Sequence, residues 1–413
     1  MTLRALFLAA LALTSGPASA AAPVARPAPT AASAGPMVFY VAKGAADACG
    51  RGCDSWIAVE GQVDAGAALR FRKFYSRVRD RDLPIYFYSP GGNLDQALAM
   101  GAMLREKPVT AGVARTVVRE CGFEAQDSDA CLKLKQSGRE LRGDLWTRGA
   151  TCNSACPYLM LGATRREIAP DALMAVHSPK VVAHFRGGVP TPQMRAAATE
   201  RGLERAHRML TSYITKMGAN LELLDLARTV KFENMHVLTR EEVVRFGIDR
   251  RERVETPWTF ENNGRSMVRK TAVQRAEGDR SWRMSQWRFV CFDADQFELD
   301  FQRPATPSPV FPTVSISSGS SSALYFKSPP VKSQGFEIWG LRMSKASVQG
   351  LADQPQFEFT ETSQGADGRR LAHSAKFSTD GLARALASLI ESCPPPKNMV
   401  LRQTIGAHDS AAK

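Results

Sequence analysis

The sequence predicts an α/β domain followed by a smaller, mainly β domain. Between residues 37 and 254, short apolar runs typical of strands alternate with helical patterns, which is the arrangement of α/β proteins. In the last third of the chain, Phe297, Leu299 and Phe301 alternate with charged residues, as in strands buried on one face. We therefore expect an α/β domain at residues 37–254 and a mainly β domain at residues 255–413.

The N-terminal end has the features of an export signal. Residues 1–20 carry one early cation, Arg4, then an apolar stretch, then small residues suited to cleavage, which is typical of a secretory signal peptide. Residues 21–36 are rich in Ala and Pro and predict a flexible leader. No later stretch is long and apolar enough to span a bilayer, so we expect a secreted or periplasmic mature chain without a transmembrane segment.

The pattern within each domain predicts its main elements. Residues 85–88 and 172–176 are strand candidates, and residues 93–106 place apolar side chains on one helical stripe. Residues 191–217 predict a long helix with Leu203, Leu210 and Ile214 on one face. In the β domain the pattern predicts short strands and, near residues 382–390, a closing C-terminal helix.

Eight cysteines, an even number, fit an oxidising compartment. Six of them form three close pairs in the sequence, although spacing alone does not fix their connectivity. A zinc site is the alternative, but the spacings are loose and no histidine lies close to the CxxxC pairs, so we expect no metal. The pairing we favour is Cys49–Cys53, Cys121–Cys131, Cys152–Cys156 and Cys291–Cys393.

The chain is strongly basic, with a formal net charge of +13 at pH 7. Such a charge could attract acidic envelope polymers or nucleic acid, but it also suits an ordinary solvated surface. The sequence has no RNP-like, zinc-finger or helix-turn-helix pattern, and no aromatic residues interleave with the Arg and Lys residues. We therefore exclude nucleic acid as a partner.

A serine in the stretch GATCNSACPYLML (149–161) has the features of a nucleophile. Ser154 lies where a helix should begin, because Pro157 is tolerated only in a first helical turn. A serine hydroxyl needs a base, and His177 follows the strand candidate at residues 172–176. Taken alone, Ser154 would be read as a helix cap and His177 as a core histidine.

Four stretches in this order resemble the proteolytic subunit of Clp protease and its relatives in the Clp/crotonase superfamily. The resemblance covers roughly residues 37–249 and implies a ClpP/crotonase-like domain of stacked β-β-α units. It also implies Ser154 as nucleophile and His177 as base, while the amides of Gly92 and Ala155 are candidates for an oxyanion hole. The stretches are SWIAVEGQV (55–63), IYFYSPGGNLDQALAMGAMLRE (85–106), GATCNSACPYLMLGATRREIAPDALMAVHSP (149–179) and LTREEVVRFGID (238–249).

The sequence has no aspartate at the position where the family places the third residue of the catalytic triad. In the family an aspartate orients the histidine, and the corresponding slot falls on Met235, beside Glu233 and Asn234. Asn234 could take that role, as in a Cys-His-Asn arrangement, and Asp225 is a weaker candidate. Two alternatives are therefore kept: a Ser–His dyad whose histidine is only weakly oriented by a third residue, and an inactive site.

Two departures from the family affect the expected site. Residues 115–149 form an extra segment that holds Cys121 and Cys131, and we expect it to be a lid or rim beside Ser154. Cys152 and Cys156 bracket Ser154, and a disulfide there would stiffen its turn.

The sequence therefore favours a serine hydrolase, a peptidase acting on a peptide or protein substrate without a cofactor. The first alternative is a catalytically degenerate relative that serves as a binding or scaffold protein of the cell envelope. Crotonase-type acyl-CoA chemistry ranks last, because coenzyme A is not expected outside the cytoplasm. A Ser–Lys dyad would use Lys133 or Lys135. No ATPase partner is expected, and the helix at residues 191–217 is the candidate contact of a homo-oligomer.

Overall fold

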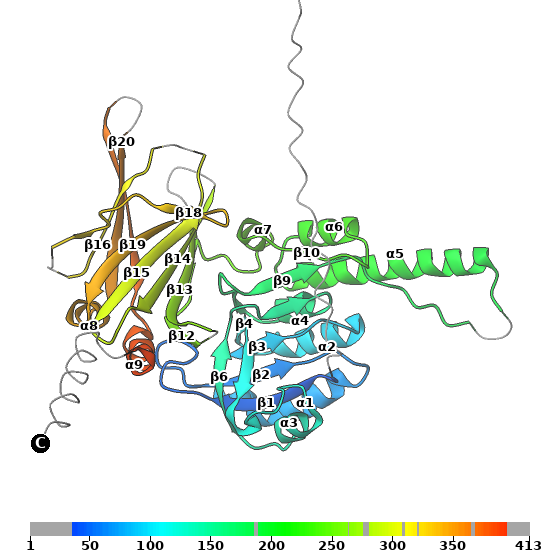
Figure 1. Ribbon diagram of the computed structural model, residues 1–413. Coiled ribbons are helices and arrows are strands. Elements are labelled where there is room, and N and C mark those ends of the chain that lie inside the picture. The colour runs from blue at the N-terminus through cyan, green and yellow to red at the C-terminus, as the bar shows by residue number, and fades with distance from the viewer. Residues whose placement is uncertain are drawn as a thin grey trace, which may run out of the picture.

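The computed structural model describes residues 35–394, except 186–188, 263, 276–280, 308–309, 320–321 and 365–367. The expected signal peptide and most of the leader lie outside the described residues, as do residues 395–413. The protein is a mixed α/β structure with several sheets (Figure 1). We use "N-terminal part" for residues 35–250 and "C-terminal part" for residues 251–394.

The N-terminal part is built on two sheets. Its larger sheet has the strand order β5-β6-β1-β2-β3-β4-β8, and its smaller sheet has the order β10-β9-β7. Strands β2, β3, β4 and β8 run parallel to one another. The strands are β1 (Val38–Lys43), β2 (Ser55–Glu60), β3 (Ile85–Tyr88), β4 (Thr110–Val113), β5 (Arg115–Val118), β6 (Leu141–Trp146), β7 (Thr151–Asn153), β8 (Arg165–Glu167), β9 (Leu173–Val176) and β10 (His236–Val237).

Helices cover these sheets and bury an apolar core between the layers. Every residue of β2 is buried, as expected for a parallel strand covered on both faces. Asn93 caps α2 because its side chain accepts a hydrogen bond from the Gln96 amide, which fixes where the helix begins after the Gly91-Gly92 turn. The helices are α1 (Ala67–Val78), α2 (Leu94–Leu104), α3 (Asp129–Lys135), α4 (Cys156–Leu161), α5 (Pro192–Lys216), α6 (Glu222–Thr229) and α7 (Arg240–Arg245), with 3-10 turns at Arg79–Arg81 and Arg119–Cys121.

The extra segment at residues 115–149 extends the larger sheet. Its strand β6 pairs with β1 and β5, and α3 lies between the two strands in the chain. Lys135 on α3 is buried and forms an ion pair of 2.8 Å with Glu60 at the end of β2. This contact fixes the segment against the end of the parallel strands.

The C-terminal part consists of two antiparallel sheets around an aromatic core. One sheet has the order β11-β13-β14-β15-β19-β18, with β12 paired to β13, and the other has the order β17-β16-β20-β21. The elements are β11 (Arg253–Glu255), β12 (Thr259–Asn262), β13 (Ser266–Arg275), β14 (Trp282–Cys291), β15 (Gln296–Pro304), β16 (Thr313–Ser317), β17 (Leu324–Tyr325), β18 (Val331–Ser333), β19 (Phe336–Ser344), α8 (Lys345–Ala352), β20 (Gln356–Gln364), β21 (Arg370–Ser378) and α9 (Leu382–Ser392).

The C-terminal part touches the N-terminal part through a few polar contacts. Arg148, just before β7, forms an ion pair with Glu261 on β12. Arg384 on α9 donates to the carbonyl oxygen of Ala46. The end of the extra segment is thereby tied to the C-terminal part.

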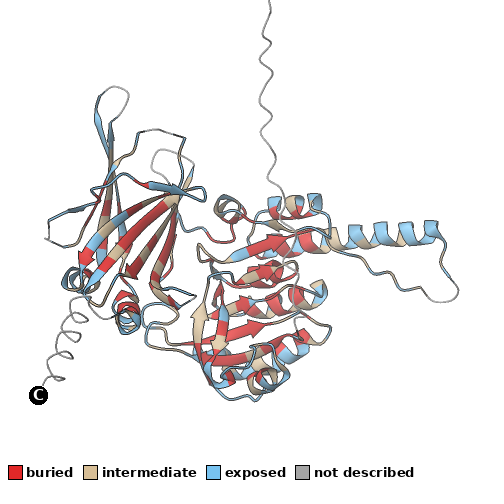
Figure 2. Ribbon diagram, in the orientation of Figure 1, coloured by how far each residue is buried: buried red, intermediate tan, exposed pale blue. Residues whose placement is uncertain are grey.

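Helix α5 projects away from the rest of the molecule (Figure 1). Its last turns pack into the core through Leu210, Tyr213 and Ile214, but most of its earlier residues are exposed (Figure 2). Leu203, expected on the apolar face, is 41% exposed, because this part of α5 extends beyond the sheet. Within the described residues, no helix is long and apolar enough to cross a membrane.

Candidate active site

Ser154 lies in a tight turn between a strand and a helix. Strand β7 ends at Asn153 and α4 begins at Cys156, and Ser154 between them has a φ of 59°, in the left-handed region. Non-glycine residues seldom adopt this conformation, and strained backbone of this kind is common at catalytic nucleophiles. The Ser154 amide donates to the carbonyl oxygen of Ala175 on β9.

Disulfide bonds constrain this turn and three other places in the chain. Cys152 and Cys156 form a disulfide on the two sides of Ser154, with their Cα atoms 5.2 Å apart. Both cysteines are fully buried. The structure contains the four disulfides that the sequence favours: Cys49–Cys53, Cys121–Cys131, Cys152–Cys156 and Cys291–Cys393. Four disulfides fit a protein of an oxidising, extracellular environment.

His177 directly follows β9 and reaches the serine. Its Nε2 lies 2.7 Å from Ser154 Oγ, which is hydrogen-bond distance. The pairing of β7 with β9 places both residues at the same end of one small sheet. The amide of Ser178 donates to the carbonyl oxygen of Val230, and the ring of Phe232 packs on the imidazole with centroids 4.8 Å apart.

The surroundings of His177 favour the neutral imidazole. Burial lowers the pKa of His177 below its usual 6.5. The backbone carbonyl of Phe232 and the charge of Glu233 raise this pKa and offset part of the effect of burial. A neutral imidazole at neutral pH can accept the proton of a serine hydroxyl.

Among the described residues, no side chain occupies the third position of a catalytic triad. Nδ1 of His177 is buried, and no side chain of the described residues bonds it; besides Ser154, the polar group that acts on the imidazole is the backbone carbonyl of Phe232. Asn234, the predicted orienter, is exposed, and its amide donates to the carbonyl oxygen of Lys231. The orienting role of Asn234 therefore stays a prediction.

The glycine turn after β3 packs directly against the serine turn. A Cβ atom added to Gly91 would lie 2.5 Å from Ser154 Cβ and 2.9 Å from the Ala155 nitrogen, so only glycine fits. Among the described residues, neither the Gly92 nor the Ala155 amide donates to a protein acceptor. The Ala155 amide directly follows the nucleophile, and the Gly92 amide belongs to the glycine turn that packs against it. Their role as an oxyanion hole stays a prediction.

Two residues that the sequence analysis did not single out hold the glycine turn. Ser89 Oγ donates to the carbonyl oxygen of Gly61 and accepts from the Gly91 amide. Val63 bonds the same turn, because its amide donates to the Gly91 carbonyl oxygen and its carbonyl oxygen accepts from Asn93. Both residues belong to stretches that carry the family resemblance, Ser89 to SPGG and Val63 to SWIAVEGQV, but neither was expected to hold the turn.

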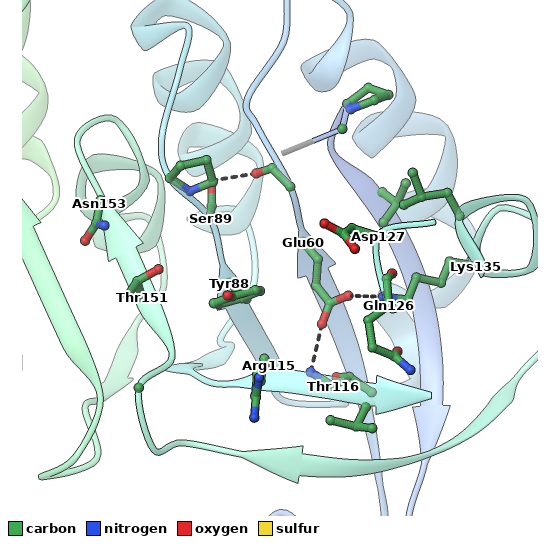
Figure 3. Close-up of a pocket in the computed structure, with 18 residues that line it drawn as sticks. Glu60, Tyr88, Ser89, Arg115, Thr116, Gln126, Asp127, Lys135, Thr151 and Asn153 are labelled. Carbon is green, nitrogen blue, oxygen red and sulfur yellow. Dashed lines mark hydrogen bonds and ion pairs between the residues drawn. The ribbon is translucent and has the colours of Figure 1, made fainter. Parts of the chain in front are cut away.

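The extra segment forms one wall of a cavity next to this site. The cavity has a volume of about 590 Å³. Ser89 and Asn153 line it on one side, and Asp127 and Lys135 of the extra segment line it on the other (Figure 3). Lys135 lines the cavity, but its Nζ bonds Glu60 and the Gln126 carbonyl oxygen. The hydrogen-bond partner of Ser154 Oγ is His177 and not a lysine.

No protein-family model and no curated protein matches the chain. Among solved structures, a mutant of the 1510-N membrane-bound stomatin-specific protease is similar, with 15% identity, 46% of this chain and 73% of that chain covered, and a TM-score of 0.28. Another mutant of that protease, in complex with a substrate peptide, is 15% identical. The match covers 46% of this chain and 71% of that chain, with a TM-score of 0.27. The invasion associated protein b from Bartonella henselae is 12% identical. The match covers 32% of this chain and 92% of that chain, with a TM-score of 0.26. At these TM-scores the likenesses carry no argument about function.

Proposed function

We propose that the protein is a secreted or periplasmic serine hydrolase with a ClpP/crotonase-like N-terminal domain, and that it acts as a peptidase. The observation that carries the proposal is the 2.7 Å contact between His177 Nε2 and Ser154 Oγ. The left-handed turn at Ser154 supports the same interpretation, as do the Ala155 and Gly92 amides, which donate to no acceptor among the described residues. A helix cap requires neither the histidine nor the second amide.

In the proposed reaction Ser154 Oγ attacks the scissile carbonyl carbon while His177 Nε2 takes the hydroxyl proton. The Gly92 and Ala155 amides stabilise the tetrahedral oxyanion; removal of one such donor costs about 3–4 kcal/mol of barrier in a serine protease. The C–N bond breaks as the imidazolium gives its proton to the leaving amine. Water then releases the acyl group from Ser154, with His177 again acting as the base.

Fluorophosphonate labelling of the purified mature protein tests the proposal. We expect covalent modification at Ser154, mapped by mass spectrometry, and its loss in Ser154→Ala and His177→Ala. Ser178→Ala is the matched control, since Ser178 neighbours His177 and its backbone amide makes the bond to Val230. Equal background labelling of wild type and Ser154→Ala would exclude the hydrolase.

One observation favours a second candidate, a binding or scaffold protein of the cell envelope. Among the described residues no acid bonds Nδ1 of His177, so the base lacks the group that orients it in a triad. In a serine protease, loss of that acid costs about 10⁴-fold in rate, so a dyad of this kind is slow or inactive. Peptide binding that Ser154→Ala leaves intact, together with no labelling of wild type, would identify this second function.

A further inference from the structure

We infer that the C-terminal part holds a separate binding site, a cavity between its two sheets that takes a single-chain amphiphile with an apolar tail and an anionic head. The site lies outside the residues of the proposed hydrolase, so the inference does not depend on that function. It is carried by the position of the cavity, by the pattern of the side chains that line it and by its charged groups.

The cavity lies at one end of the two sheets, opposite the helices of the C-terminal part. Helices α8 and α9 lie at the other end, where Cys291 at the end of β14 is joined to Cys393 after α9 (Figure 1). The first residues of β14, 282–285, line the cavity together with the ends of neighbouring strands. Its volume of about 580 Å³ is within the range of small-ligand pockets. Because side chains normally fill the space between packed sheets, a cavity of this size leaves room for a ligand.

The side chains that point between the sheets change from apolar to polar as the strands reach the cavity. Alternate residues of a strand share one face, so on β15 the buried Phe301 is followed on that face by Arg303. On β20 the buried Phe359 is followed in the same way by Glu361. These four side chains line the cavity, and Phe377 on β21 adds a third buried ring. The cavity therefore has an aromatic floor, which a hydrocarbon tail can contact, and polar groups toward the strand ends.

The carboxylate in the lining is compensated by neighbouring cations. Arg303 forms an ion pair of 2.5 Å with Glu361 and one of 3.0 Å with Glu337. Lys332 is a second cation for Glu337, at 3.8 Å. Two cations thus balance two carboxylates, and Glu361 leaves no net negative charge in the cavity. His373 also lines the cavity, and its ring contacts a side chain of β13.

Arg283 gives the cavity a positive charge. It lies near the start of β14, on the same face of the strand as the buried Trp287, and its side chain lines the cavity. Its guanidinium has no hydrogen bond and no ion pair with any other residue that the structure describes. A guanidinium binds a carboxylate or a phosphate through paired hydrogen bonds, so the cavity favours a ligand with an anionic head.

The walls of the cavity favour a hydrocarbon chain over a peptide. They are paired strands, with β13 joined to β14, β14 to β15 and β20 to β21. Backbone groups of paired strands are already hydrogen-bonded within the sheet, so the walls present side chains to the cavity. A peptide buried between them would leave its own N–H and C=O groups without partners, which is costly, whereas a hydrocarbon chain has no such groups.

Displacement of a fluorescent fatty acid tests the inference on the full mature chain. The probe is dansyl-undecanoic acid, and the competitors are dodecanoate, octanoate and dodecyltrimethylammonium below their micelle-forming concentrations. We expect dodecanoate to compete at least about tenfold better than octanoate, because each buried methylene adds affinity. Dodecyltrimethylammonium has the same tail and the opposite charge, and it should compete at least about tenfold less well than dodecanoate.

Substitution of Arg283 tests the recognition of the anionic head. Arg283→Gln should weaken dodecanoate binding at least about fivefold and leave dodecyltrimethylammonium binding unchanged, whereas Arg283→Lys should keep most of the preference. Arg342→Gln is the matched control, since Arg342 is an exposed arginine of β19 that does not line the cavity.

Substitution of Ser285 tests the location. Ser285 lines the cavity on β14, and Ser285→Phe should fill the space and weaken dodecanoate binding at least about tenfold. Ser374→Phe is the control, because Ser374 is exposed on β21 and does not line the cavity. Denaturant unfolding shows whether Ser285→Phe is folded. If it is not, Ser363→Phe, at an exposed position of the lining, makes the same test.

The outcomes separate this site from the nucleophile and from a peptide site. No probe binding, equal competition by dodecanoate and dodecyltrimethylammonium, or affinity unchanged when the cavity is filled would overturn the inference. Tighter binding of the peptide Gly-Gly-Phe than of dodecanoate would replace the amphiphile with a peptide. Ser154→Ala should bind dodecanoate as wild type does, whether or not wild type reacts with fluorophosphonate. Loss of dodecanoate binding in Ser154→Ala would assign the ligand to the N-terminal part and reject the proposed site.

Discussion

The charge state of His177 governs how the proposed nucleophile responds to pH. Burial lowers the pKa of this imidazole below 6.5, so the neutral base persists into mildly acidic solution. We expect the rate of fluorophosphonate labelling at Ser154 to be constant near pH 7–8 and to fall as the pH drops through this lowered pKa. The measurement is the labelling rate between pH 4 and 8.

The residual labelling of His177→Gln should not show this transition, since glutamine does not titrate. A midpoint above 6.5 in wild type would contradict the expected direction of the pKa shift.

Gly91 should be irreplaceable because of its contact with the serine turn. It has a φ of 96°, and a Cβ atom would lie 2.5 Å from the Asn153 carbonyl oxygen. We expect Gly91→Ala to reduce the labelling rate at least about 100-fold, as displacements of about 1 Å in an active site do. Gly138→Ala is the matched control, because Gly138 also has a positive φ but would meet no atom within 4 Å. Similar losses in both variants would show a general backbone effect.

The sequence predicts the Ser154–His177 pair but not what surrounds Nδ1 of the histidine. The pair depends on two neighbouring strands and one turn, each with a local signal in GATCNSACPYLML and in residues 172–176. The surroundings of Nδ1 depend on how Phe232 and Glu233 fold back over β9. Tertiary packing sets where these residues lie, so their spacing in the sequence does not predict it.

Among the elements, the strand-to-helix turn at Ser154 depends on its disulfide. Replacing Cys152 and Cys156 together with alanine should lower the free energy of unfolding by about 2 kcal/mol, the entropy of a five-residue loop. It should also slow labelling, because Ser154 is then free to leave its left-handed conformation. Denaturant unfolding and labelling measure the two effects.

The Cys49–Cys53 bond is the matched control for this prediction. It has the same sequence separation of 4 and lies outside the serine turn. Its double alanine variant should lose similar stability and keep its labelling rate. Slower labelling in both double variants would mean that the effect is one of global stability.

Helix α3 is held by a buried ion pair that the sequence does not reveal. Lys135→Met leaves Glu60 buried without its cation, and we expect a loss of about 3–5 kcal/mol in the free energy of unfolding. Adding Glu60→Gln should recover part of this loss, because the stranded charge is removed. Lys133→Met, an exposed position on the same helix, should have little effect in the same denaturant experiment. Equal losses in the Lys133 and Lys135 variants would contradict the assignment.

Local signals predict elements better than they predict what those elements pack against. Thr239 and Glu242 form the capping box at the start of α7, and both partners of this local signal lie within four residues of the sequence. The apolar spacing likewise predicts α5, but it places Leu203 on a buried face that the structure exposes. The periodicity predicts which side chains form the apolar stripe of a helix. Whether that stripe is buried depends on how far the sheet extends beneath the helix.

At the scale of the whole molecule, the C-terminal part contacts the N-terminal part through pairs of long sequence separation. The Arg148–Glu261 pair joins residues 113 positions apart, and Arg384 reaches Ala46 over 338 positions. No pattern in the sequence indicates such pairs. The composition of residues 255–413 predicts a mainly β structure but not which part of the α/β layers it contacts.

The projecting helix α5 is the surface through which we expect copies of the chain to associate. Its outer turns expose Met194 and Leu203 at 52% and 41%, and the preceding segment exposes Val189 at 93%. Apolar groups that are exposed on a projecting arm gain free energy when a second copy covers them. We expect light scattering to give a mass above one chain at micromolar concentration.

Leu203→Asp tests this surface, because a carboxylate buried between two copies would lack a partner. The variant should shift the mass toward one chain while circular dichroism stays unchanged. Leu69→Asp is the control, since Leu69 on α1 is 58% exposed and lies away from α5. A wild type that is monomeric at micromolar concentration, or one whose mass Leu203→Asp leaves unchanged, would rule out association through α5.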